Sequence, residues 1–526
     1  MTVTNMNSPT APDVNSGVAV ETVDVVIVGA RCAGTAAAVP LARAGRAVVV
    51  LDKTRFPADT LSTHVLVPNG VQELQQMGAL RKILALGPAK TKYLTLTDGD
   101  LEIRERFTPF AGIDYGLCIP RDQQDVLLVE AARDAGADVR ERCSVEQVVW
   151  RDGRAVGVRY TTREGEFEIH AKLVIGADGR KSRVAAEVDA WTPYRASKNG
   201  RGFAFRYLDD PLGEDAPSAF QIYRANGNQT LVLPSCPAGR TLVVHMCPAE
   251  DIPAFRADPE GSWQAKLDQD PALRRRVGAA TNMSKIRSTD DLSAYYRRSS
   301  GPGWALAGDA GHFKDPVTGN GMRDALKHGR LLGEAAAATI DDPDALDAAL
   351  RAWEQARDKD TISTYHWGNR ESRPEPTSPL VRAVLGTFAG SEEPNLSDTF
   401  NRARSIESII NPARLARGLL RALTTPGVDR RAVLREAWGE LPMEISARRH
   451  RLLDGFRSTK PTATERSGWS VGRAPQPPSW RAAADTETPA ANQAEFDALS
   501  RRMHGVSGCL ECRRLSELQP SRLLQR

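Results

Sequence analysis

Short apolar runs that end in glycine turns organise the first part of the chain. Val23–Val28 is almost wholly apolar, as expected of a strand buried in the middle of a parallel sheet. Gly29 permits a tight turn, and the alanine-rich stretch after it predicts a helix that stops near Gly45. Ala47–Leu51 predicts a second buried strand. The segment is therefore expected to form a strand–helix–strand unit.

This unit carries the residue types of a dinucleotide site. Gly29 and Gly34 allow the turn and the helix to approach the strand, and the helix N-terminus offers free N–H groups to a pyrophosphate. Asp52 ends the second strand, where an acid binds a ribose hydroxyl pair. Arg31 stands where the G-x-G-x-x-G pattern has its second glycine. A strand–helix–strand unit that binds nothing is the alternative.

Two later segments repeat the strand-to-glycine pattern. Leu173–Gly176 runs into Asp178-Gly179, and Trp304–Ala307 runs into Gly308-Asp309. Residues 322–338 have the pattern of a helix, so a second helix N-terminus lies just after the glycines near residue 320. Three ordered segments are more specific than one glycine loop.

The remaining pattern predicts a sheet and then a helical region. Residues 202–208, 219–223, 230–233 and 240–246 alternate apolar and polar positions, which predicts strands of a sheet covered on one face. Apolar positions at helical spacing, such as Leu415, Leu419 and Leu423, predict helices after residue 367.

Composition excludes several classes of protein. Lys and Arg number 70 and Asp and Glu 66, a net charge of +4 over 526 residues, so no nucleic-acid-binding face is expected. No apolar run reaches the length of a membrane span, and the N-terminus lacks the pattern of a secretory signal. Seven scattered cysteines do not suggest a disulfide framework, so we expect a cytoplasmic protein. A peripheral membrane contact and the oligomeric state are left open.

In their order and spacing, the three glycine-bearing segments resemble the para-hydroxybenzoate hydroxylase-like flavoproteins. This superfamily contains group A flavin monooxygenases, geranylgeranyl reductases and flavin-dependent halogenases. The resemblance covers roughly residues 20 to 350. It implies an α/β fold with a Rossmann-like FAD-binding domain of the glutathione-reductase type, an inserted, mostly antiparallel β-sheet substrate domain and a C-terminal helical cap. The expected layout is a disordered leader (1–19), the FAD-binding domain in two parts (20–198 and 297–366), the substrate sheet (199–296), the helical region (367–456), and a linker with a mobile tail (457–526).

The resemblance also implies which residues contact FAD. The pyrophosphate would lie on the first glycine turn, the adenosine at the end of the second strand, and the ribityl chain and flavin at the later motifs. NADH or NADPH would supply electrons without a second Rossmann unit. The implied FAD-binding residues are Gly29, Ala30, Gly34, Asp52, Lys53, Arg121, Val145, Asp178, Gly179, Asp309, Gly321 and Met322.

Catalytic residues are not identified by any motif, and three candidates remain. His64 follows the ribose acid and lines the flavin in relatives, or else lies on the surface beside a helix cap. His312 and Lys314 follow the Gly-Asp motif and could lie over the flavin ring, or else Lys314 is a loop charge paired with Asp315. In the tail, Cys509, Cys512 and His504 supply three ligands where zinc takes four, so no metal site is expected.

The favoured function is an NAD(P)H-dependent FAD monooxygenase that acts on an aromatic or otherwise apolar small molecule. The alternative is a geranylgeranyl reductase-like enzyme that transfers hydride to a carbon–carbon double bond, which the wording Lys314-Asp315-Pro316 favours. A halogenase is disfavoured because the Trp-x-Trp-x-Ile-Pro motif is absent. The fourth hypothesis for the function is a protein that binds flavin but catalyses no reaction.

Overall fold

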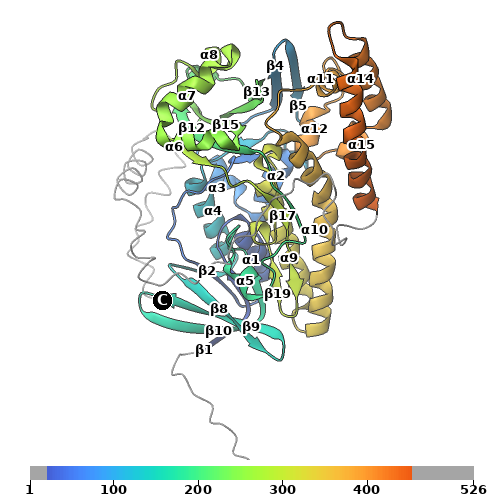
Figure 1. Ribbon diagram of the computed structural model, residues 1–526. Coiled ribbons are helices and arrows are strands. Elements are labelled where there is room, and N and C mark those ends of the chain that lie inside the picture. The colour runs from blue at the N-terminus through green and yellow to red at the C-terminus, as the bar shows by residue number, and fades with distance from the viewer. Residues whose placement is uncertain (1–19, 453–526) are drawn as a thin grey trace, which may run out of the picture. The chain divides into compact units, whose positions relative to one another are not determined.

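The computed structural model describes residues 20–452. Its first sheet has parallel strands at its centre, where β1 pairs with β10 on one side and β2 on the other (Figure 1). Two further strands extend this sheet in antiparallel orientation: β9 pairs with β10, and β8 pairs with β9. The strands in this sheet are β18 (Ser300–Gly301), β19 (Trp304–Leu306), β10 (Gly165–Gly176), β1 (Val20–Val28), β2 (Val48–Asp52), β7 (Asp138–Glu141), β8 (Ser144–Arg151) and β9 (Arg154–Thr162).

The central strands are apolar on both sides because both faces of this sheet are covered. Val25 and Ile27 of β1 pack with α1 (Cys32–Arg43), α4 (Arg121–Asp134) and α9 (Gly321–Thr339). Val26 and Val28 point the other way, into a cluster formed with β8, β9 and α5 (Arg183–Glu187).

Helices α1 and α9 lie close together because α9 carries glycines on the contact face. A Cβ at Gly329 would lie 2.4 Å from the carbonyl oxygen of Ala33, and one at Gly333 would lie 2.3 Å from that of Ala37. Any side chain there would push the helices apart. The contact brings the N-terminus of α9, which the sequence pattern correctly predicts as helical, to the glycine turn after β1.

The second sheet is mostly antiparallel and alternates strictly between its two faces. Phe203, Phe205 and Tyr207 of β12 point to the inner face, which packs against the FAD-binding domain expected from the sequence, while Ala204 and Leu208 point to the outer face. Its strand order is β16 (Arg287–Thr289), β12 (Arg201–Asp209), β15 (Arg240–Pro248), β14 (Asn228–Pro234), β13 (Ala219–Ala225), β4 (Tyr93–Asp98) and β5 (Leu101–Arg106).

Two features of this sheet depart from the sequence-based expectation. The expectation of one uncovered face is wrong, because α6 (Ile252–Ala257), α7 (Pro259–Asp268) and α8 (Pro271–Val277) bury the outer face with Phe255, Trp263 and Leu273. In addition, β4 joins β13 in parallel, so a hairpin from residues 93–106 extends the sheet although it precedes the expected 199–296 segment.

The C-terminal described residues are helical, as expected. Helix α10 (Pro343–Glu371) is continuous, so the boundary expected at residues 366–367 falls inside it. The helices that follow are α11 (Pro379–Leu385), α12 (Leu396–Asn401), α13 (Ile406–Ile409), α14 (Pro412–Thr424) and α15 (Arg430–Leu452). Smaller elements are β3 (Val65–Leu66) with β6 (Leu117–Cys118), β11 (Arg195–Ser197) with β17 (Ala294–Tyr296) and β20 (His312–Phe313), α2 (Pro68–Met77) and α3 (Leu80–Leu84).

Among the described helices, none has a stretch long and apolar enough to cross a lipid bilayer. The expected leader, linker and tail, including Cys509 and Cys512, lie outside the described residues.

Candidate functional site

The turn after β1 is built on two glycines that no other residue could replace without movement. Gly29 has φ +105°, and a Cβ there would lie 2.4 Å from the carbonyl oxygen of Ala177. A Cβ at Gly34 would lie 1.8 Å from the carbonyl oxygen of Gly29. The Gly29 N–H donates to the Leu51 carbonyl oxygen over 2.7 Å, which anchors the turn to β2. The turn is therefore held flat between β1, β2 and the start of α1.

Asp52 lies directly beside this turn. Its carboxylate accepts hydrogen bonds from the N–H of Ala30 at 2.7 Å and of Thr54 at 2.8 Å, and its residue is only 7 % exposed. The Cys143 N–H donates to the Asp52 carbonyl oxygen over 2.9 Å, which places the beginning of β8, and so Val145, next to it. Lys53 is exposed. The structure thus brings Gly29, Ala30, Gly34 and Asp52 together.

Arg31 does not disturb the turn. Its φ of −94° is ordinary for a residue with a side chain, so the backbone does not require the glycine of the common pattern. Its guanidinium bonds the Asp125 carboxylate at 2.6 Å. Arg121 bonds the same carboxylate at 2.8 and 2.9 Å. Asp125 therefore ties the start of α1 to the start of α4.

The starts of three helices converge at this point. The Gln124 side-chain N–H₂, in the first turn of α4, lies 3.6 Å from Cys32 Sγ in α1 and 3.7 Å from Met322 Sδ in α9. The Gln124 Oε1 atom is buried without a hydrogen-bond partner among the described residues. A Cβ at Gly321 would have no atom within 4 Å, so the backbone there is open to a ligand. Helix N-termini that point to one place favour an anionic group.

The two Gly-Asp motifs have different tasks. Asp178 turns its carboxylate to α5, where it accepts from Ser182 Oγ at 2.5 Å and from the Arg183 N–H at 2.6 Å, so its side chain caps a helix. Its backbone lies against Gly29, and Gly179 adopts φ +78° beside open space.

The Asp309 carboxylate, by contrast, has no hydrogen-bond partner within residues 20–452. Burial raises the pKa of Asp309, and the nearby charges of Arg180, Arg121 and Lys314 oppose that rise. The Asp309 carbonyl oxygen accepts from the Tyr295 hydroxyl at 2.6 Å, which fixes its position. A partly exposed carboxylate among cations, without a partner, is suited to bind ligand hydroxyls.

These features fit FAD. The glycine turn brings the N-terminus of α1 to where a pyrophosphate would bind, Asp52 and the first residues of β8 stand where the adenosine would lie, and Asp309 is available to ribityl hydroxyls. The N–H groups at Gly321 and Met322 would face the flavin. When bound, FAD supplies two-electron redox chemistry, and the residues described here supply its position and electrostatics.

Of the candidate catalytic residues, His64 lies at the junction with the second sheet. It is fully buried, and its backbone is left-handed at φ +56°. Its ring packs edge-on against Phe205 with 5.5 Å between ring centroids, and Nδ1 lies 2.9 Å from the Tyr207 hydroxyl oxygen. Its Nε2 atom has no hydrogen-bond partner among the described residues. Burial, with the charge of Arg121, lowers the pKa of His64 to about 3, so the ring is neutral. The alternative of a surface position for His64 is wrong.

Tyr207 was not a candidate from the sequence. Tyr207 alternates with Phe203 and Phe205 along β12, which places all three on the inner face. This alternation is the one feature of the sequence from which the position of Tyr207 could have been predicted. Its contact with a histidine 143 residues earlier in the chain is not visible in any local pattern.

His312 and Lys314 belong to a buried network behind the N-terminus of α9. His312 stacks on Tyr296 at 5.5 Å between ring centroids. Lys314 is 5 % exposed and forms an ion pair with Asp324, while Asp315 accepts from Asn199 at 2.8 Å instead. The alternative that pairs Lys314 with Asp315 is therefore wrong.

Asp324, His328 and Asp360 in this network lie close enough to share a metal ion. Both carboxylates, however, are already matched by cations. Asp324 pairs with Lys314, Arg323 and Arg402, and Asp360 pairs with Arg323, Lys327 and Arg402. The group is an ion-pair network with more positive than negative charges, and a further cation would be repelled.

We expect the buried histidines to make the protein sensitive to mild acid. Burial lowers the pKa of His64 and of His245 to about 3, whereas an unfolded histidine titrates near 6.5. The unfolded state therefore binds more protons below pH ~6.5, so the stability contribution is complete above that pH and is lost as pH falls toward 3. At about pH 5 the loss is roughly 2 kcal/mol for each histidine.

Denaturant unfolding at neutral pH and at about pH 5 measures this loss. The His245→Phe variant should lose roughly 2 kcal/mol of this acid sensitivity, and His64, His312 and His328, whose pKa values burial also lowers, should retain the rest. Equal unfolding free energies of the unsubstituted protein at the two pH values would contradict the assignment of buried, neutral histidines.

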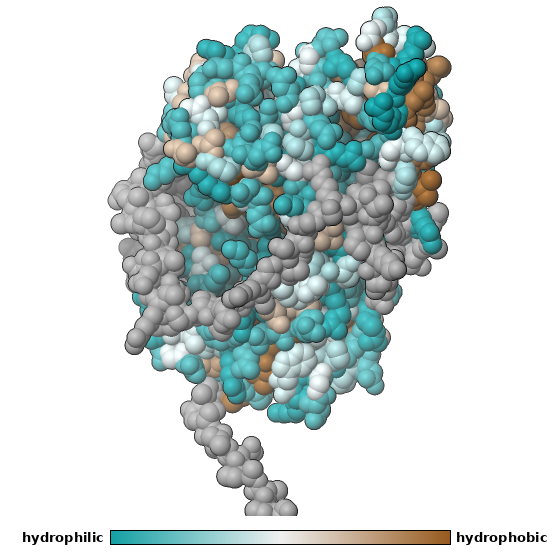
Figure 2. Space-filling view, viewed as in Figure 1, coloured by the Kyte–Doolittle hydropathy of each residue, from teal (hydrophilic) through white to brown (hydrophobic). Residues whose placement is uncertain are grey.

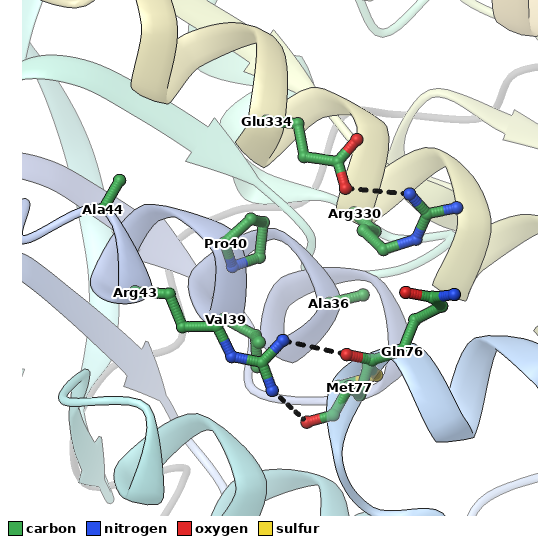
Figure 3. Close-up of a pocket in the computed structure, with 9 residues that line it drawn as sticks. All are labelled: Ala36, Val39, Pro40, Arg43, Ala44, Gln76, Met77, Arg330 and Glu334. Carbon is green, nitrogen blue, oxygen red and sulfur yellow. Dashed lines mark hydrogen bonds and ion pairs between the residues drawn. The ribbon is translucent and has the colours of Figure 1, made fainter.

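A separate pocket of about 350 Å³ lies at the opposite end of α1 from the glycine turn (Figure 3). Arg43 donates there to the carbonyl oxygens of Gln76 and Met77 at 2.9 and 3.0 Å, and Arg330 pairs with Glu334 at 2.8 Å. Because its charged groups are satisfied within the protein, we assign it no role in catalysis. Its lining residues are Ala36, Val39, Pro40, Arg43, Ala44, Gln76, Met77, Arg330 and Glu334.

Comparisons with known proteins agree with this geometry. Residues 22–359 match the model of the FAD binding domain family. The chain is 24 % identical to digeranylgeranylglycerophospholipid reductase 2 of Methanopyrus kandleri over 359 residues, which cover 66 % of this chain and 86 % of the relative. It is 28 % identical to menaquinone reductase of Mycobacterium tuberculosis over 324 residues, which cover 60 % and 76 %.

The flavin-dependent brominase Bmp2 is similar in fold, with a TM-score of 0.61 and 19 % identity over 80 % of this chain and all of that one. The expected resemblance, α/β fold and FAD cofactor are thereby confirmed. The matched segment covers well over half of the sequence and includes every residue of the glycine turn, both Gly-Asp motifs and the N-terminus of α9. This chain therefore belongs to the FAD binding domain family and is an FAD-dependent enzyme of the para-hydroxybenzoate hydroxylase-like superfamily.

Proposed function

We propose that this protein is an NAD(P)H-dependent FAD monooxygenase that acts on an aromatic or otherwise apolar small molecule. The single observation that carries the proposal is the buried His64–Tyr207 pair beside the apolar inner face of the second sheet, where the His64 carbonyl oxygen accepts from the Ile119 N–H, just before α4, at 3.2 Å.

The character of that surface supports an apolar substrate. The inner face of the second sheet is formed by aromatic and aliphatic side chains such as Phe203, Phe220 and Val244. Val317 and Phe313, which follow Asp309 in the chain, pack against the same cluster. The end of the flavin motif and the inner face therefore meet through apolar side chains, which exclude water. Oxygen chemistry on a flavin requires such exclusion of water.

The His64–Tyr207 pair supplies a position for a proton in these apolar surroundings. Either Tyr207 donates to Nδ1, or a protonated Nδ1 donates to the Tyr207 oxygen; the ring tautomer decides which. In the first case a substrate hydroxyl can give its proton to the Tyr207 oxygen while the phenol proton passes to Nδ1 of the neutral His64 ring.

Reduction of a carbon–carbon double bond is the second candidate. The relatives named as reductases of a digeranylgeranyl lipid and of menaquinone favour it. It needs a group that protonates carbon, and Asp122 is a carboxyl of suitable acidity. Burial, with the charge of Asp59, raises the pKa of Asp122 to about 6. Burial, with the charges of Cys118, Asp59 and Asp122, raises the pKa of Tyr207.

Oxygen uptake and the incorporation of oxygen into the product distinguish the monooxygenase from the reductase. The purified yellow protein is given NADH or NADPH with a panel of phenols, polyketide-like aromatics, menaquinone and geranylgeranyl lipids. We expect substrate-dependent oxygen uptake with one labelled oxygen atom from ¹⁸O₂ in the product. Anaerobic turnover of menaquinone or a geranylgeranyl lipid would overturn the monooxygenase in favour of the reductase, and product formation that requires bromide or chloride would indicate a halogenase.

A further inference from the structure

An exposed apolar stripe runs along the outer side of α15. Leu434, Trp438, Leu441 and Ile445 are 52, 77, 47 and 56 % exposed. Their spacing of four, three and four residues places them within one narrow sector of the helix. Leu420 on α14, which contacts α15, is also 64 % exposed, and Figure 2 shows apolar residues at the surface over these helices.

The stripe is not needed to hold α15 in place. The opposite side of the helix docks through Val433, which is 1 % exposed, through Glu436 on Ser378 and through Glu440 on Arg373. Helix α15 contacts α10, α11 and α14 on that side. The outward stripe therefore leaves large apolar side chains about half exposed or more on the side of the helix away from its docking contacts, which marks an interaction surface.

Arginines surround the stripe. Among the described side chains of α14, α15 and their connection, the exposed arginines outnumber the exposed carboxylates by six to one. The exposed basic residues are Arg417, Arg421, Arg430, Arg431, Arg435 and Arg449, and the exposed acid is Asp429.

We propose that the stripe of Leu420, Leu434, Trp438, Leu441 and Ile445, with its arginine rim, docks the protein on an anionic lipid surface. Leucine and tryptophan enter the boundary between headgroups and acyl chains, and arginines at their sides pair with lipid phosphates. This goes beyond the proposed reaction, because it concerns where the protein is held rather than what it catalyses.

Charge favours an anionic lipid surface over two other possible partners of the stripe, namely a second copy of the chain and the chain's own residues 453–526. A second copy would bring the same arginine rim against itself in a two-fold interface, and like charges oppose that contact. The chain's own residues 453–526 contain eleven Lys and Arg and eight Asp and Glu, so they too are net positive. An anionic lipid surface satisfies both the apolar stripe and the rim.

The surface also lies near the candidate substrate region. Leu385 of α11, with Phe388 and Leu396 after it, packs into the apolar cluster on the inner face of the second sheet. Helix α11 contacts α14 and α15 on its other side. A membrane at α15 would thus stand one helix away from that cluster.

Vesicle flotation of the full-length, FAD-loaded protein tests the proposal. We expect binding to phosphatidylcholine vesicles that contain phosphatidylglycerol, weaker binding to phosphatidylcholine alone, and release by salt. Trp438→Ser and Ile445→Ser should each weaken binding about tenfold. Arg431→Gln and Arg435→Gln should each weaken it about fivefold, and only on the anionic vesicles.

Trp150→Ser is the matched control, because Trp150 is 42 % exposed on β8 of the first sheet; it should bind vesicles like the unsubstituted protein. Retention of yellow colour in each variant verifies that it is folded. The proposal is overturned by full vesicle binding of Trp438→Ser, or by absent vesicle binding. It is also overturned if sedimentation shows a dimer that Trp438→Ser dissociates, or if Trp438 fluorescence is already shielded from acrylamide without vesicles.

Discussion

Gly34→Ala should yield a protein that purifies without yellow colour and binds added FAD at least ~100-fold more weakly, a loss of about 3 kcal/mol. The new Cβ would lie 1.8 Å from the Gly29 carbonyl oxygen and 3.3 Å from Ala177 Cβ. Backbone cannot yield as a flexible side chain does, so the glycine turn must move away from the start of α1. The N–H groups that would meet the pyrophosphate move with it. Absorbance of the purified protein and titration of the apoprotein with FAD measure the effect.

Gly439→Ala is the matched control. Gly439 also lies within a helix, α15, and a Cβ there would have no atom within 4 Å. We expect full FAD binding and up to ~1 kcal/mol of added stability from the higher helix propensity of alanine. If Gly34→Ala retains FAD as the unsubstituted protein does, the glycine turn is not the pyrophosphate site.

Asp309→Asn tests the candidate FAD site independently, at the expected ribityl position and without a change to the backbone. Because the Asp309 carboxylate has no hydrogen-bond partner within residues 20–452, its removal leaves nothing unpaired and relieves a partly buried charge. We expect an apoprotein as stable as the parent but an FAD affinity about tenfold lower. Unchanged affinity would remove Asp309 from the ribityl site and leave the glycine turn assignment untouched.

Tyr207→Phe should lower kcat about 100-fold or more while FAD content and KM stay near those of the parent. The substitution removes one oxygen atom, whose hydrogen bond to His64 Nδ1 is 2.9 Å long, and retains the ring that packs on the inner face. His64→Asn removes the other member of the pair and should lower kcat to the same extent. The variant should still fold, because asparagine also tolerates the left-handed backbone at φ +56°. Steady-state kinetics with the substrate identified by oxygen uptake measures both.

Tyr223→Phe provides the comparison. Tyr223 is a buried tyrosine of the same sheet, but it lies on the outer face, and its hydroxyl accepts from the Gln221 side chain at 3.3 Å. A merely structural loss would affect both tyrosine variants through stability and not through kcat. Turnover of Tyr207→Phe at the parental rate would show that the His64–Tyr207 pair moves no proton in the reaction.

The amino-acid sequence by itself determined the features that depend on local backbone. The glycine turn, Asp52 at the end of β2 and the N-terminus of α9 could be predicted, because a tight turn, a strand end and a helix start are set by adjacent residues. The alternation that builds the inner face of the second sheet is equally local, since successive side chains of a strand point to opposite faces.

Tertiary structure decided everything that depends on which distant groups meet. Tyr207 reaches His64 across 143 residues, Lys314 pairs with Asp324 and not with the adjacent Asp315, and the Asp178 carboxylate caps α5. A hairpin from residues 93–106 extends a sheet formed mainly from residues 201–248, and α6–α8 cover its outer face. No local pattern encodes these outcomes, because buried charges and hydroxyls take whichever partner the packing of apolar faces brings within hydrogen-bonding distance.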